Sequence, residues 1–174
     1  MIGKSEIDLR LIIKLLGLFL VAEGLFMLPG VPFSLYYDDG MVVPYILSAA
    51  ITAFSGGLFW FFTRNAKDES ITKREGLAIV SFTWVTISLF GTLPFLLSGS
   101  IPSFTDAFFE TMSGFTTTGA SILTDVEAIP RSLHFWRSMT HWIGGMGIIV
   151  LSVAILPFLG IGGMQLYTAE LPGV

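Results

Sequence analysis

A polar stretch at residues 113–121 holds the groups in this chain that are best suited to chemistry. It reads Ser-Gly-Phe-Thr-Thr-Thr-Gly-Ala-Ser and lies between long apolar segments. Non-helical backbone at membrane depth persists only where it is buried in protein or lines a water-filled cavity. Extended or left-handed backbone over residues 116–119 can aim successive carbonyl oxygens at a shared axis, where they replace the water around a cation. The stretch is therefore predicted to be a pore loop.

Local geometry favours a cation in such a loop. Gly119 allows a positive φ, which residues with a side chain resist. Threonine hydroxyls either hold the loop against the helix before it or donate one more oxygen. That short helix, expected over 105–114, ends with its carbonyls toward the cavity, and the negative end of its dipole attracts a cation. The alternative is a Thr/Gly-rich turn that ends a surface helix. The pattern of span, short helix, loop and span favours the pore loop.

Two histidines are the other candidates for chemistry. His134 and His141 are seven residues apart and share a helix face. Two histidines are too few for a metal site, and no carboxylate lies at ligand spacing on that helix. We expect them to lie at the membrane interface with Trp136 and Trp142.

Enzymatic readings have little support. Ser113 and His141 suggest the nucleophile and base of an intramembrane serine hydrolase. The usual Gly-x-Ser-x-Gly elbow, however, is missing. No glycine-rich phosphate loop precedes a lysine, and the chain has no cysteine for a disulfide or a thiolate metal site. We expect no enzyme and no cofactor. The glycines of 144–147 are expected to let the last helix pack closely or bend.

Composition places the chain in a bilayer. Its 174 residues are 53% hydrophobic and 13% charged, with a mean hydropathy of +0.78. An average soluble domain is about 25% charged. The net charge of −4 argues against nucleic acid as a partner.

A transmembrane helix needs about 20 mostly apolar residues. Four stretches fit this description: 11–28, 42–62, 76–97 and 133–159. The first is expected to end at Pro29–Pro32, because proline lacks a backbone donor. Residues 36–40 are then expected to form a hydrophilic turn. The pore helix over 105–114 is too short to cross, and residues 115–121 follow it as the filter.

These segments predict an all-α integral membrane protein. Residues 1–68 form a leading pair of transmembrane helices. Residues 69–174 form one repeat of membrane helix, pore helix, filter loop and membrane helix. Ser55–Gly57 favours close helix packing in the second span. Glu23 lies deep in the first span, where a carboxylate is a functional candidate by default. The plainer alternatives are a neutral or hydrogen-bonded carboxyl group, or a position nearer the surface.

Basic residues set the orientation. Seven of the nine fall on one side if three spans alternate: Lys4, Arg10, Lys14, Arg64, Lys67, Lys73 and Arg74. The positive-inside rule makes that side, with the amino terminus, cytoplasmic. The short helix and filter then re-enter from outside, and Arg131 and Arg137 are external exceptions.

The chain resembles the Trk/Ktr/HKT superfamily of potassium transporters. The matching runs are Lys73–Gly76, Thr105–Glu110, Ser113–Ala120, Trp142–Leu151 and Gly162–Leu166. In that superfamily, four membrane helix–pore helix–membrane helix repeats in one polypeptide surround one ion path. The resemblance implies that Thr117 and Thr118 offer backbone carbonyls to potassium, with Thr116 and Gly119 flanking them. Potassium is then the transported substrate, taken up across the cytoplasmic (inner) membrane.

The chain departs from that pattern in its repeat number. It holds one Thr/Gly-rich loop of this kind, and one loop leaves its ion half-solvated. We expect it to be a fragment that needs the missing pore repeats, or to assemble with further copies. The alternative is a non-conducting remnant or membrane scaffold that only packs with other subunits. The resemblance further implies a homodimer of full-length subunits with a nucleotide-binding cytoplasmic regulatory protein.

Overall fold

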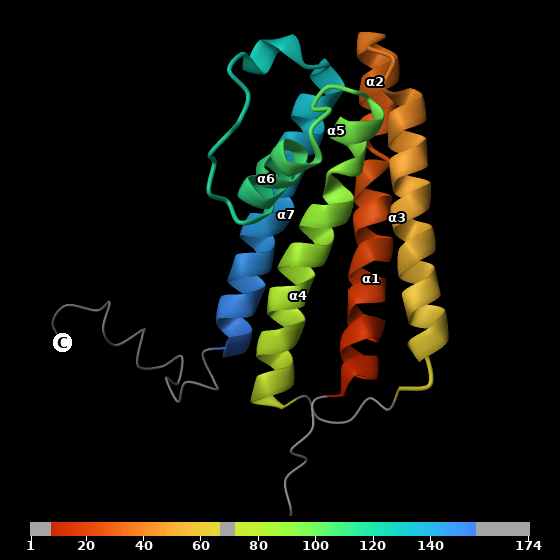
Figure 1. Ribbon diagram of the computed structural model, residues 1–174, viewed down its shortest axis with the longest axis vertical. Helices are drawn as coiled ribbons and strands as arrows, with labels where there is room; N and C mark the ends of the chain where they lie inside the picture. Colours follow the sequence, from red (N-terminus) through yellow and green to blue (C-terminus); the bar gives the residue numbers. More distant parts are fainter. Residues whose placement is uncertain (1–7, 67–71, 156–174) are drawn as a thin grey trace, which may run out of the picture.

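A computed structural model describes residues 8–66 and 72–155 (Figure 1). Its elements in chain order are α1 (Leu9–Met27), α2 (Gly30–Tyr37), α3 (Val42–Thr63), α4 (Lys73–Gly91), α5 (Leu93–Leu97), α6 (Phe104–Phe115), a 3-10 turn η1 (Val126–Ala128) and α7 (Arg131–Ile155). The described residues contain no strand. The all-α fold class is therefore confirmed.

The first span is longer than predicted. α1 ends at Met27, so the expected end of the first helix at Pro29–Pro32 is confirmed, but a second helix, α2, runs from Gly30 to Tyr37 and extends the span to Tyr37. Pro32 lies in the first turn of α2, where proline is tolerated because the N–H groups there have no intrahelical partner. The tyrosines belong to the helix, and the turn is made by Asp38 and Gly40, whose φ angles are 52° and 73°.

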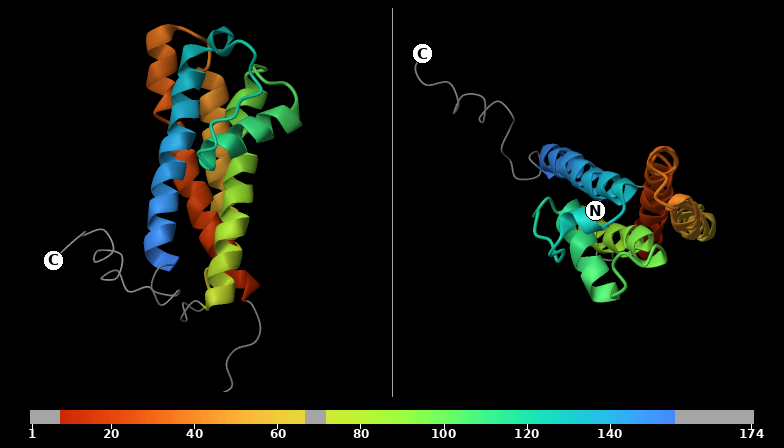
Figure 2. Two further views of the ribbon diagram at one scale, coloured as in Figure 1. Left: turned by 90° about the vertical axis from the view of Figure 1, so that its left-hand side faces the viewer. Right: turned by 90° about the horizontal axis from the view of Figure 1, so that it is seen from above.

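Three segments are long and apolar enough to cross a membrane: Leu9–Tyr37, Val42–Thr63 and Arg74–Leu97. They run side by side, and α7 lies along the same bundle (Figure 1, Figure 2). The starts of α1 and α4 and the end of α3 meet at one end of the bundle, which we call the lower end. α2, α5 and the start of α7 meet at the opposite, upper end. The expected last span, 133–159, is described only as far as Ile155; residues 156–159 lie outside the described residues, as does the 162–166 run.

Glycine brings α1 and α3 into close contact. A Cβ atom on Gly17 would lie 2.7 Å from the backbone oxygen of Gly56, and one on Gly24 would lie 2.9 Å from that of Ala49. The predicted close packing at Ser55–Gly57 is confirmed for Gly56. Gly57 has nothing within 4 Å of its Cβ position.

The start of α7 is tied to the leading helices. Asp39 Oδ2 accepts a hydrogen bond from the Ser132 N–H (2.8 Å), and the Tyr45 hydroxyl donates to the Ser132 oxygen (2.7 Å). Asp39 Oδ1 accepts from the Ser34 hydroxyl (2.7 Å). Partial burial alone would raise the pKa of Asp39, but the hydrogen bonds from Ser132, Ser34 and Met41 lower it below its ordinary value. Asp39 thus caps a helix that begins far along the chain.

A buried aromatic core fills the space beneath this junction. Trp136, Tyr45, Phe95 and Phe115 are each less than 2% exposed. The Trp136 indole N–H donates to the Gly91 oxygen at the end of α4 (3.0 Å). The expected interfacial position of Trp136 is therefore wrong, because its face of α7 is turned to α4. Trp142 lies on another face and is 55% exposed.

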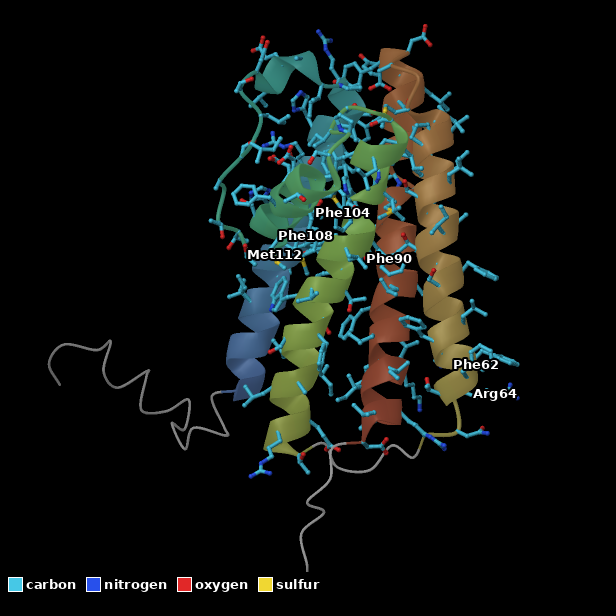
Figure 3. The ribbon with its side chains drawn as sticks, viewed as in Figure 1. Phe62, Arg64, Phe90, Phe104, Phe108 and Met112 are labelled. Atoms are coloured by element: carbon cyan, nitrogen blue, oxygen red, sulfur yellow. The ribbon has the colours of Figure 1, made fainter. Side chains whose placement is uncertain are left out.

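α6 is held between α4 and α7 and does not cross the bundle. Figure 1 shows that it leaves the upper end, and that the chain after it returns to that end. Phe104, Phe108 and Met112 line up along α6 (Figure 3). Ser88 of α4 donates to the sulfur of Met112 (3.4 Å). The re-entrant path expected for this segment is the path observed.

Candidate pore-loop site

The end of α6 is shaped by an unusual threonine. Thr117 has φ 56°, a left-handed conformation in which a residue with a Cβ is strained by about 1–2 kcal/mol. Two backbone hydrogen bonds hold it: Thr118 N–H to Ser113 O and Thr117 N–H to Gly114 O, both 2.9 Å. This is the Schellman pattern that commonly ends a helix, with threonine where glycine is usual. The loop is therefore fixed to the last turn of the helix.

The backbone oxygens of residues 116–119 accept no hydrogen bond from the described residues, 8–66 and 72–155. Thr117, Thr118 and Gly119 are exposed. Gly119 has φ 76°, and a Cβ there would meet nothing within 4 Å, so its only demand is the positive φ. Four consecutive predicted ligand residues thus present free carbonyls on one short stretch.

Threonine hydroxyls stabilise the loop. Thr116 Oγ1 donates to the Met112 oxygen (2.7 Å) and lies 2.8 Å from Thr118 Oγ1. Of the two uses expected for the hydroxyls, the structure places Thr116 in the first, holding the loop to its helix.

A partly buried ion pair anchors the far side of the loop. Glu110 of α6, 5% exposed, accepts from Arg137 of α7, with distances of 2.8 Å to Nε and 2.6 Å to Nη2. The same carboxylate accepts from the Ser121 hydroxyl (2.9 Å) and the Ile122 N–H (3.0 Å). Charge-assisted bonds of this kind are the strong ones. Glu110 therefore joins the pore helix, the returning chain and α7 at one point.

Sequence reasoning missed this anchor. In the sequence, Arg137 stands out only as an external exception to the charge bias, and Glu110 only as part of the family-like run Thr105–Glu110. A basic residue inside an apolar span, with an acid on the neighbouring short helix, was the signal available.

Close packing of α7 against α6 depends on glycine. A Cβ on Gly144 would overlap the backbone oxygen of Phe115 and lie 2.7 Å from its carbonyl carbon. A Cβ on Gly114 would overlap the Thr140 hydroxyl. The expectation that the glycines of 144–147 permit close packing is confirmed at Gly144. The Phe115 oxygen faces α7, which restricts the candidate ligands to the residues after it.

The hydrolase and metal alternatives find no support in the geometry. Ser113 donates its hydroxyl to the Ala120 oxygen (2.6 Å), and His141 Nδ1 lies 2.9 Å from the Arg137 oxygen. Serine and histidine are thus each engaged elsewhere. In the part of the chain that the structure describes, no three metal-ligating side chains come together.

Together these features define an integral membrane protein built around a re-entrant helix and an open-carbonyl loop. The model of the TrkH family, described as "Cation transport protein", matches residues 43–173. The chain belongs to this family, which is one of transport proteins and not of enzymes.

Characterised relatives agree with this assignment. The chain is 44% identical over 167 residues to the Trk system potassium uptake protein TrkH of Halomonas elongata, covering 95% of this chain and 34% of that protein. It is 36% identical to TrkG of Escherichia coli, covering 94% of this chain and 34% of that protein. The crystal structure of the potassium transporter TrkH from Vibrio parahaemolyticus superposes with a TM-score of 0.82 at 42% identity, covering 94% of this chain and 35% of that one. The chain thus spans about a third of the length of these relatives.

Proposed function

We propose that the chain supplies one wall of a potassium pathway, in which the carbonyls of Thr117 and Thr118 bind the ion and Thr116 and Gly119 flank them. The observation that carries this proposal is the run of four unengaged, non-helical backbone oxygens directly after α6. Rings of carbonyls replace the hydration shell of potassium in known filters. The choice of potassium as the ion is supported by the relatives, which are named as potassium uptake proteins.

One loop is insufficient for a complete site. A cation bound only on one side keeps its water on the other, which gives little selectivity. We therefore propose that further loops complete the ring, from additional pore repeats or further copies of the chain. The exposure of Thr117–Gly119 supports this, because an open face is what neighbouring loops would need.

Orientation is proposed from charge. Arg10, Lys14, Arg64, Lys73 and Arg74 all lie near the lower end, where α1 and α4 start and α3 ends. The positive-inside rule makes this the cytoplasmic face of the inner membrane, so the loop opens to the outside. A dimer of full-length subunits and a nucleotide-binding regulatory partner remain proposals from the family resemblance.

The decisive experiment replaces Gly119 by Ala in the transporter that contains this chain. Alanine adds no clash, so the change acts only through the positive φ of 76°. Potassium uptake and the preference for potassium over sodium are measured in cells that lack their own potassium uptake. We expect selectivity to fall, because the carbonyls on either side of residue 119 must reorient.

Gly99 offers a matched control. It has φ 71° and an equally open Cβ position, but it lies in the α5–α6 connection. Gly99→Ala carries the same backbone cost of about 1 kcal/mol without touching the loop. Equal transport by the two variants would contradict the filter assignment. Reconstituting the 174-residue chain alone in liposomes then separates a pathway completed by other copies, which conducts, from a non-conducting scaffold.

A further inference from the structure

An apolar cleft lies between α1, α4 and α7, apart from the pore loop. Its volume is about 390 Å3. α1 contributes Phe19 and Phe26 to its walls, α4 contributes Ile79 and Trp84, and α7 contributes Met146. α6 packs on both α4 and α7 and so keeps these two helices apart beside the cleft.

A carboxylate without a partner lines this cleft. Glu23 is 4% exposed, and neither of its oxygens has a hydrogen-bond partner among the described residues. Thr83 Oγ1, on the α4 wall, is likewise buried without a partner. Burying a polar group unpaired costs several kcal/mol in hydrocarbon, and an unpaired charge costs more. Two unpaired polar groups on one cleft, a carboxyl group and a hydroxyl group that can both accept, indicate a site that a donor completes.

The described residues offer no basic side chain to Glu23. The residues lining the cleft include no lysine, arginine or histidine. Arg137 is engaged by Glu110, and His141 lies against the Arg137 oxygen. The cleft therefore leaves room for a donor that a bound molecule brings to Glu23. Phe26 and Met146 are 39% and 48% exposed, so the cleft opens at the surface.

We propose that this cleft binds a lipophilic amine, a molecule with an apolar body and one ammonium group. Its body lies among the aromatic and aliphatic walls, and its ammonium donates to Glu23 and to the Thr83 hydroxyl. Charge complementarity selects the amine, because an ammonium has three donors and no acceptor, and its bonds to a carboxylate are charge-assisted. The volume lies within the range of sites for small organic ligands.

The cleft also contacts the support of the pore loop. A Cβ on Gly91 would lie 3.1 Å from Glu23 Oε1 and 3.0 Å from the Phe115 ring, so carboxylate and ring flank one backbone position. Phe115 in turn ends α6. An amine held by Glu23 therefore sits one residue away from the aromatic core under the loop.

The test measures the saturable binding of radiolabelled dodecylamine to the transporter that contains this chain. The protein is held in phosphatidylcholine nanodiscs, and the binding to empty nanodiscs is subtracted. Dodecanol and dodecanoate serve as competitors of the same length. We expect saturable binding that Glu23→Gln weakens at least tenfold, and that dodecylamine but not dodecanoate displaces. Glu127→Gln, the same change at an exposed position on η1, should leave binding unchanged.

Two further variants keep the proposal falsifiable if Glu23→Gln folds poorly. Ala22→Phe fills the cleft from α1, and Thr83→Val removes the second acceptor with little change of shape. The first should abolish saturable binding and the second should weaken it severalfold. Binding that is only unsaturable partitioning, or that is equal in wild type and in the variants, would overturn the proposal. Unsaturable partitioning is the result expected if another membrane helix or water occupies the cleft.

Discussion

Replacing Gly144 by Ala tests the packing that positions the pore loop. The added Cβ would overlap the Phe115 oxygen and lie 2.7 Å from its carbonyl carbon and 2.9 Å from its Cα. Ordinary carbon–carbon contacts lie at about 3.5–4.0 Å, so the two backbones must separate by roughly 1 Å. A flexible side chain does not absorb this movement, because the three nearest atoms all belong to the Phe115 backbone.

The magnitude follows from two opposing terms. Overpacking a tight contact costs about 1–3 kcal/mol, and backbone against backbone places this case near the upper value. Alanine in place of glycine inside a helix returns about 1 kcal/mol. We therefore expect Gly144→Ala to lower the free energy of unfolding by about 2 kcal/mol. The pore loop, which begins one residue after Phe115, moves with it, so potassium uptake should fall as well.

Gly145 is the matched control on the same helix. A Cβ there would lie 3.9 Å from Thr117 Cγ2, an ordinary contact, so Gly145→Ala keeps the helix-propensity gain without the clash. Thermal unfolding of the purified protein should then separate the two variants by about 3 kcal/mol, or about 6–12 °C for a chain of this size. Equal melting temperatures would refute the argument that Gly144 sets the distance between α6 and α7.

Two further predictions concern the polar anchors. Glu110→Gln leaves the partly exposed Arg137 guanidinium without its carboxylate and should cost roughly 2 kcal/mol, the usual worth of hydrogen bonds to a charged group. A double-mutant cycle with Arg137→Gln should give a coupling above about 0.5 kcal/mol, and additive effects would contradict the ion pair. Asp39→Asn should lower stability at neutral pH by about 1 kcal/mol, because the amide has one oxygen in place of two and leaves either the Ser132 N–H or the Ser34 hydroxyl without its acceptor. Because the pKa of Asp39 is lowered on folding, its contribution is complete above its ordinary value of 3.8 and is lost as the pH falls through the lower folded value. The difference between wild type and Asp39→Asn should thus be constant from pH 5 to pH 7 and shrink below 3.8. A difference that persists unchanged in acid would show that the carboxylate is not the cap.

Apolar length alone predicted most of the helices. The spans over 42–62 and 76–97 are observed as α3 and as α4 with α5. The short helix was recognisable because three turns cannot cross a bilayer. The end of the first helix before Pro29 was also predicted, but the new helix α2 that follows it was not: proline ends the helix that precedes it and is tolerated in the first turn of a new one. Sequence alone does not say which of these occurs.

The polar anchors were beyond sequence reasoning for a different reason. Asp39 and Ser132 are 93 positions apart, and Glu110 and Arg137 are 27 apart. Nothing local indicates that such residues meet. Trp136 was misplaced because tryptophan is typical of both interfaces and buried cores, and only the neighbouring α4 decides between them. The left-handed Thr117 was likewise hidden, because glycine is the residue that normally signals that conformation.

The bond from Asp39 to the start of α7 has a consequence for the order of assembly. A ribosome adding about 5–20 residues per second makes Ser132 some 5–20 seconds after Asp39. During that time α1, α2 and α3 can pair, because their mutual contacts involve no later residue. The carboxylate that receives the first turn of α7 is then in place before that turn is synthesised. The leading helices can thus fold first and provide the surface against which the pore-bearing repeat packs.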